Sequence, residues 1–342
     1  MMHEMIIEEI KEVAKHFSFK EELKNKSILI TGGTGLIGSY LIRTLQYLNR
    51  TEQLNIKILG VARSREKVQK LELEDNVTWI YQDMKDSFND LKALDYILHT
   101  ASPTDSSYFI HSPVEVINDT MAGLNSILTL ARNSKAQGVV FLSSLEVYGT
   151  CLEDRFLKEN EYFSIDCTNV RNSYSEGKKI LECLCASYAT EYQVPVKIVR
   201  LGQCFGPGVA YTDNRVFAQF ARSVTEEQDI ILATKGETKR SYCSIKDAIL
   251  GIFTALVNGK AGEAYNLASD ASYHSIYELA TFFIKDTNSN IIIEEKQDNK
   301  YLGTIQFGLD TEKIKGIGFT SVESLPQMVS RLKAYFKTLN HA

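Results

Sequence analysis

The fold is decided by SILITGGTGLIG, residues 27–38. Its first four residues form a short apolar run, a glycine-rich turn follows without a gap, and a helical pattern occupies residues 39–45. Strand, glycine turn and helix start are the context that a dinucleotide-binding fingerprint requires. Gly32 permits the tight turn, Gly35 lets the backbone approach a pyrophosphate at the positive end of the helix, and Gly38 lets the helix pack closely on the strand. The alternative is a tight strand–helix turn without a ligand.

The rest of the chain repeats this alternation of strand and helix. Amphipathic stretches such as 114–131 and 174–192 separate apolar runs at 56–61, 77–81, 96–99, 139–142 and 196–199. Strands alternating with helices of this length indicate a parallel sheet covered on both faces. With the glycine turn after its first strand, the sequence predicts an α/β doubly wound (Rossmann) fold with ligands at the carboxyl ends of the strands. Beyond residue 200 the pattern loosens, which predicts a smaller C-terminal substrate-binding portion.

Three parts of the chain follow from this pattern. Residues 1–26 are an N-terminal amphipathic extension, residues 27–200 the dinucleotide-binding Rossmann domain, and residues 201–342 mainly a substrate-binding portion that is partly interleaved with it. The extension has Ile6, Ile7, Ile10 and Val13 at helical spacing and lacks the continuous apolar core of a signal peptide. It packs either on its own chain or in an oligomer contact.

Composition limits the classes of partner. The 342 residues are 44% hydrophobic and 24% charged, an ordinary globular composition. The net charge of −5 gives no basic footprint for nucleic acid. No stretch is long enough to span a membrane, and the six cysteines have no metal-ligand spacing, so no metal site is predicted. Cys183 and Cys185 are expected to be buried, and free thiols favour a reducing, cytoplasmic location.

Two segments carry acid–base chemistry: SSLEVYG at 143–149 and YSEGK at 174–178. Tyr174 and Lys178 are four apart, so in a helix they share one face, and an ammonium beside a phenol favours the phenolate. Ser144 and Glu146 are two apart after an apolar run and would point to the same side at a strand end. We expect these four residues to be catalytic. The alternatives are a chance Tyr–Lys pair and a structural carboxylate at Glu146.

These segments together resemble the extended short-chain dehydrogenase/reductase family, which comprises nucleotide-sugar epimerases, dehydratases and decarboxylases. The resemblance covers almost the whole chain beyond residue 26. HTASP at 99–103 is similar to the family's segment after the fourth strand, and RNSYSEGK at 171–178 resembles the R-x-x-Y-x-E-G-K form of UDP-glucuronate decarboxylases. Further segments resemble the nucleotide-sugar-binding parts of that branch, namely 200–207, 213–216, 236–240 and 265–267.

The resemblance implies binding residues for a cofactor and a sugar nucleotide. With the fingerprint, it assigns the cofactor to Gly32, Gly35, Leu36, Ile37, Gly38, Arg63, Asp83, Met84, Thr100, Ala101, Ser102, Tyr174 and Lys178. It assigns the substrate, a UDP-sugar in that branch, to Pro103, Ser144, Gln203, Arg215 and Arg240. It also implies a homodimer packed through the helix that carries Tyr174 and the preceding helix at 114–131.

The implied reaction begins with transient oxidation of a sugar at C4. Tyr174 removes the C4 hydroxyl proton, and the 4-keto sugar acidifies C5, so that decarboxylation, dehydration or re-reduction can follow. Glu146 favours decarboxylation or dehydration. Leu145 stands where 4,6-dehydratases usually have Asp and decarboxylases usually have Ser, so a 4-epimerase or an NADP-dependent keto-sugar reductase also remains. A non-catalytic dinucleotide sensor is a remote third reading, because it needs no proton-transfer residues.

The cofactor has two candidate identities. The resemblance implies NAD, kept bound while the enzyme re-uses its own hydride. An NAD site usually has an acidic residue at the end of the second strand, where this chain has Arg63 and Arg65. Basic residues there can hold the 2′-phosphate of NADP, so NADP is the alternative, and a solvated loop is the reading without a ligand.

Overall fold

A computed structural model describes residues 3–71, 73, 76–88, 91, 93–103, 106–295 and 306–340. Within this part of the chain, seven parallel strands form the main sheet in the order β11-β7-β5-β4-β1-β2-β3. The strands are β1 (Ser27–Thr31), β2 (Lys57–Ala62), β3 (Val77–Tyr81), β4 (Tyr96–His99), β5 (Gly138–Ser144), β7 (Val196–Leu201) and β11 (Ala264–Leu267). The predicted doubly wound fold is confirmed, and each predicted apolar run lies on a strand.

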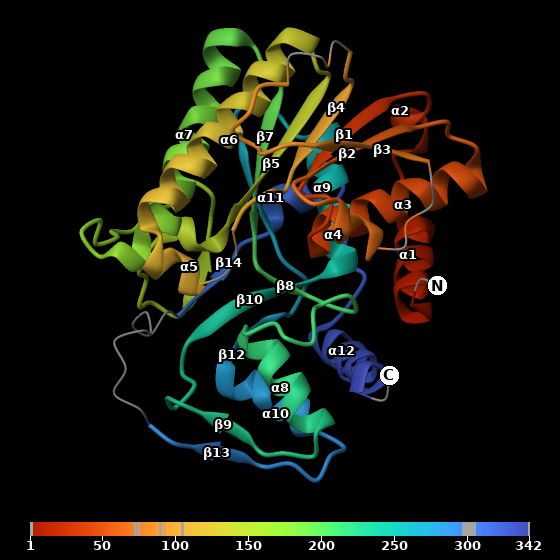
Figure 1. Cartoon of the computed structure of the whole chain (residues 1–342). Helices are drawn as coiled ribbons and strands as arrows, with labels where there is room; N and C mark the ends of the chain where they lie inside the picture. The colour runs from red at the N-terminus through yellow and green to blue at the C-terminus, as the bar shows by residue number, and fades with distance from the viewer. Residues whose placement is uncertain are drawn as a thin grey trace.

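Helices cover both faces of this sheet (Figure 1). One face is packed by α3 (Leu36–Glu52) and α9 (Ile245–Asn258), and the other by α6 (Pro113–Ser134) and α7 (Ser173–Tyr192). Each side has its own apolar core: Ile30 and Leu41 belong to the first, and Leu29 and Leu128 to the second. Consecutive β1 residues therefore face opposite cores, as expected for a strand buried on both sides.

The N-terminal extension packs on its own chain. Helix α1 (Glu4–His16) contacts α3 and α9 and buries Ile6, Ile10 and Val13. A buried charge cluster joins it to the C-terminal half: the Glu9 carboxylate lies 2.7 Å from Arg331 and 3.4 Å from Lys246. Burial, reinforced by the neighbouring carboxylate of Glu323, raises the pKa of Glu9 to about 7.

The smaller portion gathers below the main sheet in Figure 1. It contains α8 (Val216–Thr225), α10 (Ile276–Ile284) and α12 (Leu325–Asn340) with three small sheets. These sheets are β8 (Gln203–Phe205) with β10 (Lys239–Ser244) and β12 (Tyr273–Ser275), β9 (Ile230–Leu232) with β13 (Ile291–Ile293), and β6 (Arg155–Leu157) with β14 (Phe307–Leu309). Because α9 and β11 return to the main sheet, the two portions are interleaved in sequence.

Short elements connect these parts: α2 (Lys20–Leu23), α4 (Arg65–Gln69), α5 (Ser106–His111), η1 (Leu145–Tyr148), η2 (Val170–Asn172) and α11 (Glu312–Lys315). The cysteine prediction is half right. Both cysteines lie on α7. Cys185 is buried, but Cys183 is exposed, because side chains two positions apart in a helix point to different faces. None of the described helices combines the length and the apolar character needed to cross a membrane.

Candidate active site

The strand order creates a crevice at the carboxyl ends of β1 and β4. From β1 the chain moves outward to β2 and β3, and then returns to the other side of β1 as β4. Ligands of doubly wound sheets bind at such a switch point. Here the Thr31 hydroxyl lies 2.8 Å from Nδ1 of His99, and the Thr100 hydroxyl donates to the carbonyl of Thr31 at 2.7 Å. These bonds fix the two strand ends together.

The glycine turn fits a dinucleotide. Gly32 has φ +66°, and a Cβ there would lie 2.9 Å from the backbone N of Ala101. A Cβ on Gly38 would overlap the carbonyl of Gly32. Gly35 is the N-cap of α3, and no side chain caps this helix end. The N–H groups of its first turn, at Leu36, Ile37 and Gly38, are therefore available to a pyrophosphate.

The other residues assigned to the cofactor surround this turn. Arg63 is exposed just beyond β2, and the guanidinium of Arg65 lies 4.7 Å from the centroid of the Tyr81 ring on β3. Asp83 accepts a hydrogen bond from the backbone N of Lys85, and Met84 packs against α6. All of them lie near the carboxyl ends of β2 and β3, the edge at which an adenosine would bind.

The predicted acid–base residues come together where β5 meets α7. The side chains of Ser144, at the end of β5, and Ser102, just after β4, lie beside the Tyr174 phenol and act to lower its pKa. The Phe109 ring of α5 stacks on the Tyr174 ring, with centroids 4.5 Å apart and planes 12° from parallel. Phe109 therefore covers one face of the phenol ring, and two serine side chains lie beside it.

Lys178 lies one turn further along α7 and is buried. Its Nζ donates to the carbonyl of Leu142 at 2.8 Å and lies 5.8 Å from the Tyr174 ring centroid. Burial lowers the pKa of Lys178 to about 8. The pKa of Tyr174 is raised, by burial first and by the Glu146 carboxylate second. The expectation of a lowered pKa is therefore not met, because desolvation is the largest effect on the phenol.

Glu146 sits in η1, beside the phenol. Its Oε2 accepts a hydrogen bond from Ser175 at 3.1 Å and lies 3.5 Å from Nη1 of Arg171. Its backbone N donates to the Ser144 hydroxyl at 3.2 Å. A carboxylate held in this way stays oriented toward the cluster and can exchange a proton with a group bound between it and Tyr174.

Leu145, between the two polar residues, points elsewhere. It is 3% exposed and belongs to a separate apolar cluster that includes Tyr148, Leu157 and Leu309. Position 145 of η1 therefore offers an apolar packing residue and no acid.

The residues assigned to the substrate are spread over the smaller portion. Gln203 on β8 and Arg240 on β10 share one small sheet, and the buried Nε of Arg240 has no hydrogen-bond partner among the described residues. Arg215 caps the start of α8, where its guanidinium binds the Asp213 carboxylate at 2.6 Å. Pro103 follows Ser102 at the crevice. Arg240 therefore retains a donor for an anion, whereas Arg215 is already paired.

Residues 28–268 match the NAD dependent epimerase/dehydratase family. The chain belongs to this family. A dTDP-D-glucose 4,6-dehydratase of Bos taurus is 25% identical over 307 residues, which are 86% of this chain and 84% of that protein. UDP-glucuronic acid decarboxylase 1 of Xenopus tropicalis is 27% identical over 263 residues, 77% of this chain and 60% of that protein. The crystal structure of a Bacillus cereus UDP-glucuronic acid 4-epimerase, in complex with UDP-glucuronic acid and NAD, superposes with a TM-score of 0.75 at 20% identity, covering 92% of this chain and 99% of that one.

Three residues of this epimerase/dehydratase site were missed by sequence reasoning. Arg171 and Ser175, which hold Glu146, lie inside the quoted segment 171–178 and could have been found as neighbours of Tyr174 in a helix start. Phe109 could not, since it belongs to the short helix α5 and reaches Tyr174 only through the folded chain.

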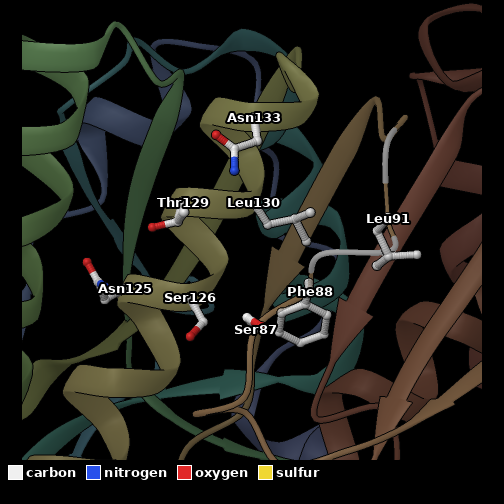
Figure 2. A pocket seen from close by; sticks show the side chains of 8 residues that line it. All are labelled: Ser87, Phe88, Leu91, Asn125, Ser126, Thr129, Leu130 and Asn133. Carbon is white, nitrogen blue, oxygen red and sulfur yellow. The ribbon is translucent and has the colours of Figure 1, made fainter.

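A hollow of about 540 Å³ lies apart from the predicted site residues, between α6 and the segment after β3, as Figure 2 shows. Its lining consists of Ser87, Phe88, Leu91, Asn125, Ser126, Thr129, Leu130 and Asn133. None of these is a predicted site residue and none carries a charge, so this hollow offers no acid–base group.

Proposed function

We propose that this enzyme acts on a nucleotide diphosphate sugar, most closely a UDP-sugar, through transient oxidation at C4 followed by loss of a group from the neighbouring carbons. The observation that carries the proposal is the single cluster formed by Tyr174, Ser144, Lys178 and Glu146 at the switch-point crevice. The first three suit removal and return of a hydroxyl proton, and the fourth adds a second acid–base group.

Each residue has a distinct part in this scheme. The glycine turn and Lys178 would hold NAD⁺, which would supply a reversible hydride acceptor for C4 and a positive charge beside the phenol. Tyr174 takes the proton of the C4 hydroxyl, and Ser144 hydrogen-bonds the same oxygen while charge develops on it. Lys178 holds the cofactor's ribose hydroxyls and places its ammonium close to the phenol. Ser102 keeps the Tyr174 hydroxyl aimed into the crevice.

Decarboxylation is the version that the site supports best. A 4-keto sugar with a C6 carboxylate is a β-keto acid: the C5–C6 bond breaks, CO₂ leaves, and the electron pair remains as an enolate over C5, C4 and the C4 oxygen. C5 then takes a proton, which Glu146 can deliver. Dehydration needs an acid to expel the C6 hydroxyl, and the buried Leu145 offers none. Arg240, with its unpartnered Nε, suits an anionic group of the substrate.

A 4-epimerase or a keto-sugar reductase is the second candidate. Both need only the proton transfer of Tyr174 and hydride transfer, and Leu145 is compatible with either. The exposed cationic side chain of Arg63 favours a reductase, which consumes NADPH. A dinucleotide sensor without chemistry is the least supported reading, since it has no use for Glu146 and its two partners.

The cofactor is NAD in this proposal, with NADP as the alternative. Arg63 is exposed at the strand end where an acid usually binds the ribose diol, and Arg65 extends the positive charge toward Tyr81. Denaturing the purified protein and weighing the released nucleotide distinguishes the two. Bound NAD supports a closed redox cycle, whereas empty protein that binds NADP(H) more tightly than NAD(H) supports the reductase.

We also propose a cytoplasmic homodimer packed through α6 and α7, in which residues 201–342 mainly bind the sugar nucleotide. Exposed apolar side chains on these helices support the dimer: Val114 is 61%, Ile117 41% and Ile180 46% exposed. Light scattering after gel filtration should give twice the chain mass, and an Ile117→Glu/Ile180→Glu variant should be monomeric. A monomeric wild type would contradict the dimer.

The reaction is tested by product analysis. Purified protein is incubated with UDP-glucuronate, UDP-glucose or dTDP-glucose, and products are identified by mass. Decarboxylation should yield a pentose nucleotide and CO₂ with no net change in added NAD(P). A 6-deoxy-4-keto product would instead show dehydration, and an isomer of unchanged mass would show epimerisation. Stoichiometric loss of NADPH in the presence of a 4-keto sugar would show reduction. Tight NAD(P) binding without turnover of any sugar nucleotide would favour the sensor.

A further inference from the structure

Three consecutive residues of β5 hold three residues of α7 that are spaced four apart. The Leu142 carbonyl accepts from Lys178, the Ser143 hydroxyl donates to Glu182 at 2.6 Å, and the Ser144 side chain lies beside Tyr174 and acts to lower its pKa. Residues four apart lie on one helix face. The chemistry proposed above uses two of the three α7 residues and leaves Glu182 without a part.

Glu182 is buried together with a buried cation. Its carboxylate lies 2.7 Å from Nη2 of Arg200 on β7, and Nε of Arg200 also donates to it, at 3.1 Å to one oxygen and 3.2 Å to the other. The strand register pairs Arg200 with Ser143, so both groups that bind Glu182 come from adjacent strands. The carboxylate is therefore fixed between α7 and these strands, where it and Arg200 line a hollow of about 480 Å³ that includes none of the predicted site residues.

We propose that Glu182, which follows Lys178 by one turn of α7, is a positioning residue that keeps the Lys178 side chain protonated. This inference rests on the proposed function, in which the Lys178 ammonium supports Tyr174. A buried ammonium loses its hydration and needs a fixed counter-charge to remain ionised. Leu142 supplies only a carbonyl dipole, so the negative charge must come from a neighbouring side chain.

The charges around Lys178 single out Glu182. His99 on β4 is neutral, because burial and then Lys178 lower its pKa to about 3, and burial keeps the thiol of Cys185 protonated. Glu146 on η1 is held by Ser175 and Arg171. Tyr174 is a neutral phenol for the reasons given above. Arg200, on β7, is a cation that is itself paired with Glu182.

Burial lowers the pKa of Lys178 to about 8, and the charge of Glu182 acts against this fall. Without Glu182 the pKa of Lys178 would fall further. The same ion pair could instead serve only to tie α7 to β7. These two roles differ in one respect: only an electrostatic role moves the titration of Lys178.

The experiment compares three variants of the full chain. Glu182→Gln removes the charge with little change of shape. Glu182→Gln/Arg200→Met removes both charges, so that no buried cation is left unpaired if the single variant fails to fold. Ser143→Ala is the matched control, because it removes a hydrogen bond to Glu182 and keeps its charge. Protein labelled with ¹³C at the lysine ε-carbon is titrated by NMR, and the Lys178 signal is assigned by its loss in Lys178→Met.

We expect Glu182→Gln to lower the titration midpoint of Lys178 by about one pH unit or more, the usual effect of losing an adjacent opposite charge. The double variant should lower it too, since Lys178 responds to Glu182 and no effect of Arg200 on it is resolved. Ser143→Ala should leave it unchanged. An unchanged midpoint in either folded charge variant overturns the inference, as does an equal shift in Ser143→Ala.

The same variants separate this inference from the proposed function. If the enzyme turns over a sugar nucleotide, the alkaline limb of its kcat profile should move to lower pH in Glu182→Gln by the same interval as the NMR midpoint. A limb that stays in place while the midpoint moves refutes the link between Lys178 and catalysis. If no sugar nucleotide reacts, the proposed function fails, and the NMR titration still decides the role of Glu182.

Discussion

Replacing Gly32 by alanine tests whether the glycine turn is the cofactor site. Gly32 has φ +66°, a left-handed backbone that costs an L-residue about 1–2 kcal/mol. The added Cβ would lie 2.9 Å from both N and Cα of Ala101, whereas carbon atoms normally approach to about 3.5 Å or more. Backbone must therefore move, by roughly 0.6 Å at least, to relieve this overlap.

The displaced atoms are those assigned to the cofactor. Gly32 and Ala101 flank the switch point, so the movement opens the crevice and shifts the first turn of α3 with it. We expect the free energy of unfolding to fall by about 2–3 kcal/mol. We expect NAD(P) affinity to fall at least about tenfold, which corresponds to about 1.4 kcal/mol of binding free energy.

Gly177→Ala is a matched control within the catalytic segment. This glycine lies inside α7, and a Cβ there would meet no atom within 4 Å. Alanine should therefore stabilise the helix by about 0.5–1 kcal/mol. Both variants are unfolded in urea, and NAD⁺ and NADP⁺ binding is measured by calorimetry. If the wild type retains its nucleotide on purification, the amount released on denaturation replaces calorimetry.

One pair of results would refute this reasoning. If folded Gly32→Ala binds NAD(P) as tightly as the wild type, the glycine turn is not where the pyrophosphate lies. If Gly177→Ala is destabilised as strongly as Gly32→Ala, the magnitudes derived from Cβ contacts are wrong.

Three further predictions follow from the site and the charge cluster. Tyr174→Phe keeps its ring stack but loses the proton carrier, so turnover should fall by about 10²- to 10⁴-fold with cofactor binding intact; unchanged activity would rule out the mechanism. Glu146→Gln should leave C4 oxidation in place, so a 4-keto intermediate should accumulate in mass spectra; a variant with full activity makes the residue structural. The pKa of Glu9 is raised from 4.5 to about 7, so between these pH values the native chain binds a proton that the unfolded chain has lost. Stability should therefore fall by up to about 3 kcal/mol as pH rises through this window, and urea titrations should find the slope lost in Glu9→Gln and kept in the exposed control Glu8→Gln.

Most of the fold was accessible from sequence because its signals are local. Strands buried on both faces read as continuous apolar runs, and the glycine turn marks the strand after which the first helix begins. The catalytic residues were accessible for a similar reason: Tyr174 and Lys178 share a helix face, and Ser144 ends a strand. Within one helix or strand, the sequence spacing alone determines which side chains share a face.

What sequence reasoning missed depends on contacts between elements. Phe109 stacks on Tyr174 from a separate helix, and neither residue signals the other. The pKa of Tyr174 was misjudged because helix spacing shows the nearby ammonium but not the desolvation, which is the larger effect. The sequence does not predict which surface the N-terminal helix packs on. An amphipathic pattern shows that one face of a helix is buried, but it does not show which element covers that face.

The backbone of η1 determines which of its side chains face Tyr174. Ser144 and Glu146 face Tyr174 because Leu145, between them, is anchored among Leu157 and Leu309. A carboxylate substituted at position 145 without any change of backbone would lie unpaired in that apolar cluster, at a cost of several kcal/mol. In this chain the apolar packing of Leu145 leaves Glu146 as the one carboxylate of η1 beside the phenol. In the reaction proposed above, Glu146 is therefore suited to deliver the proton to C5, and position 145 offers no acid to expel a C6 hydroxyl.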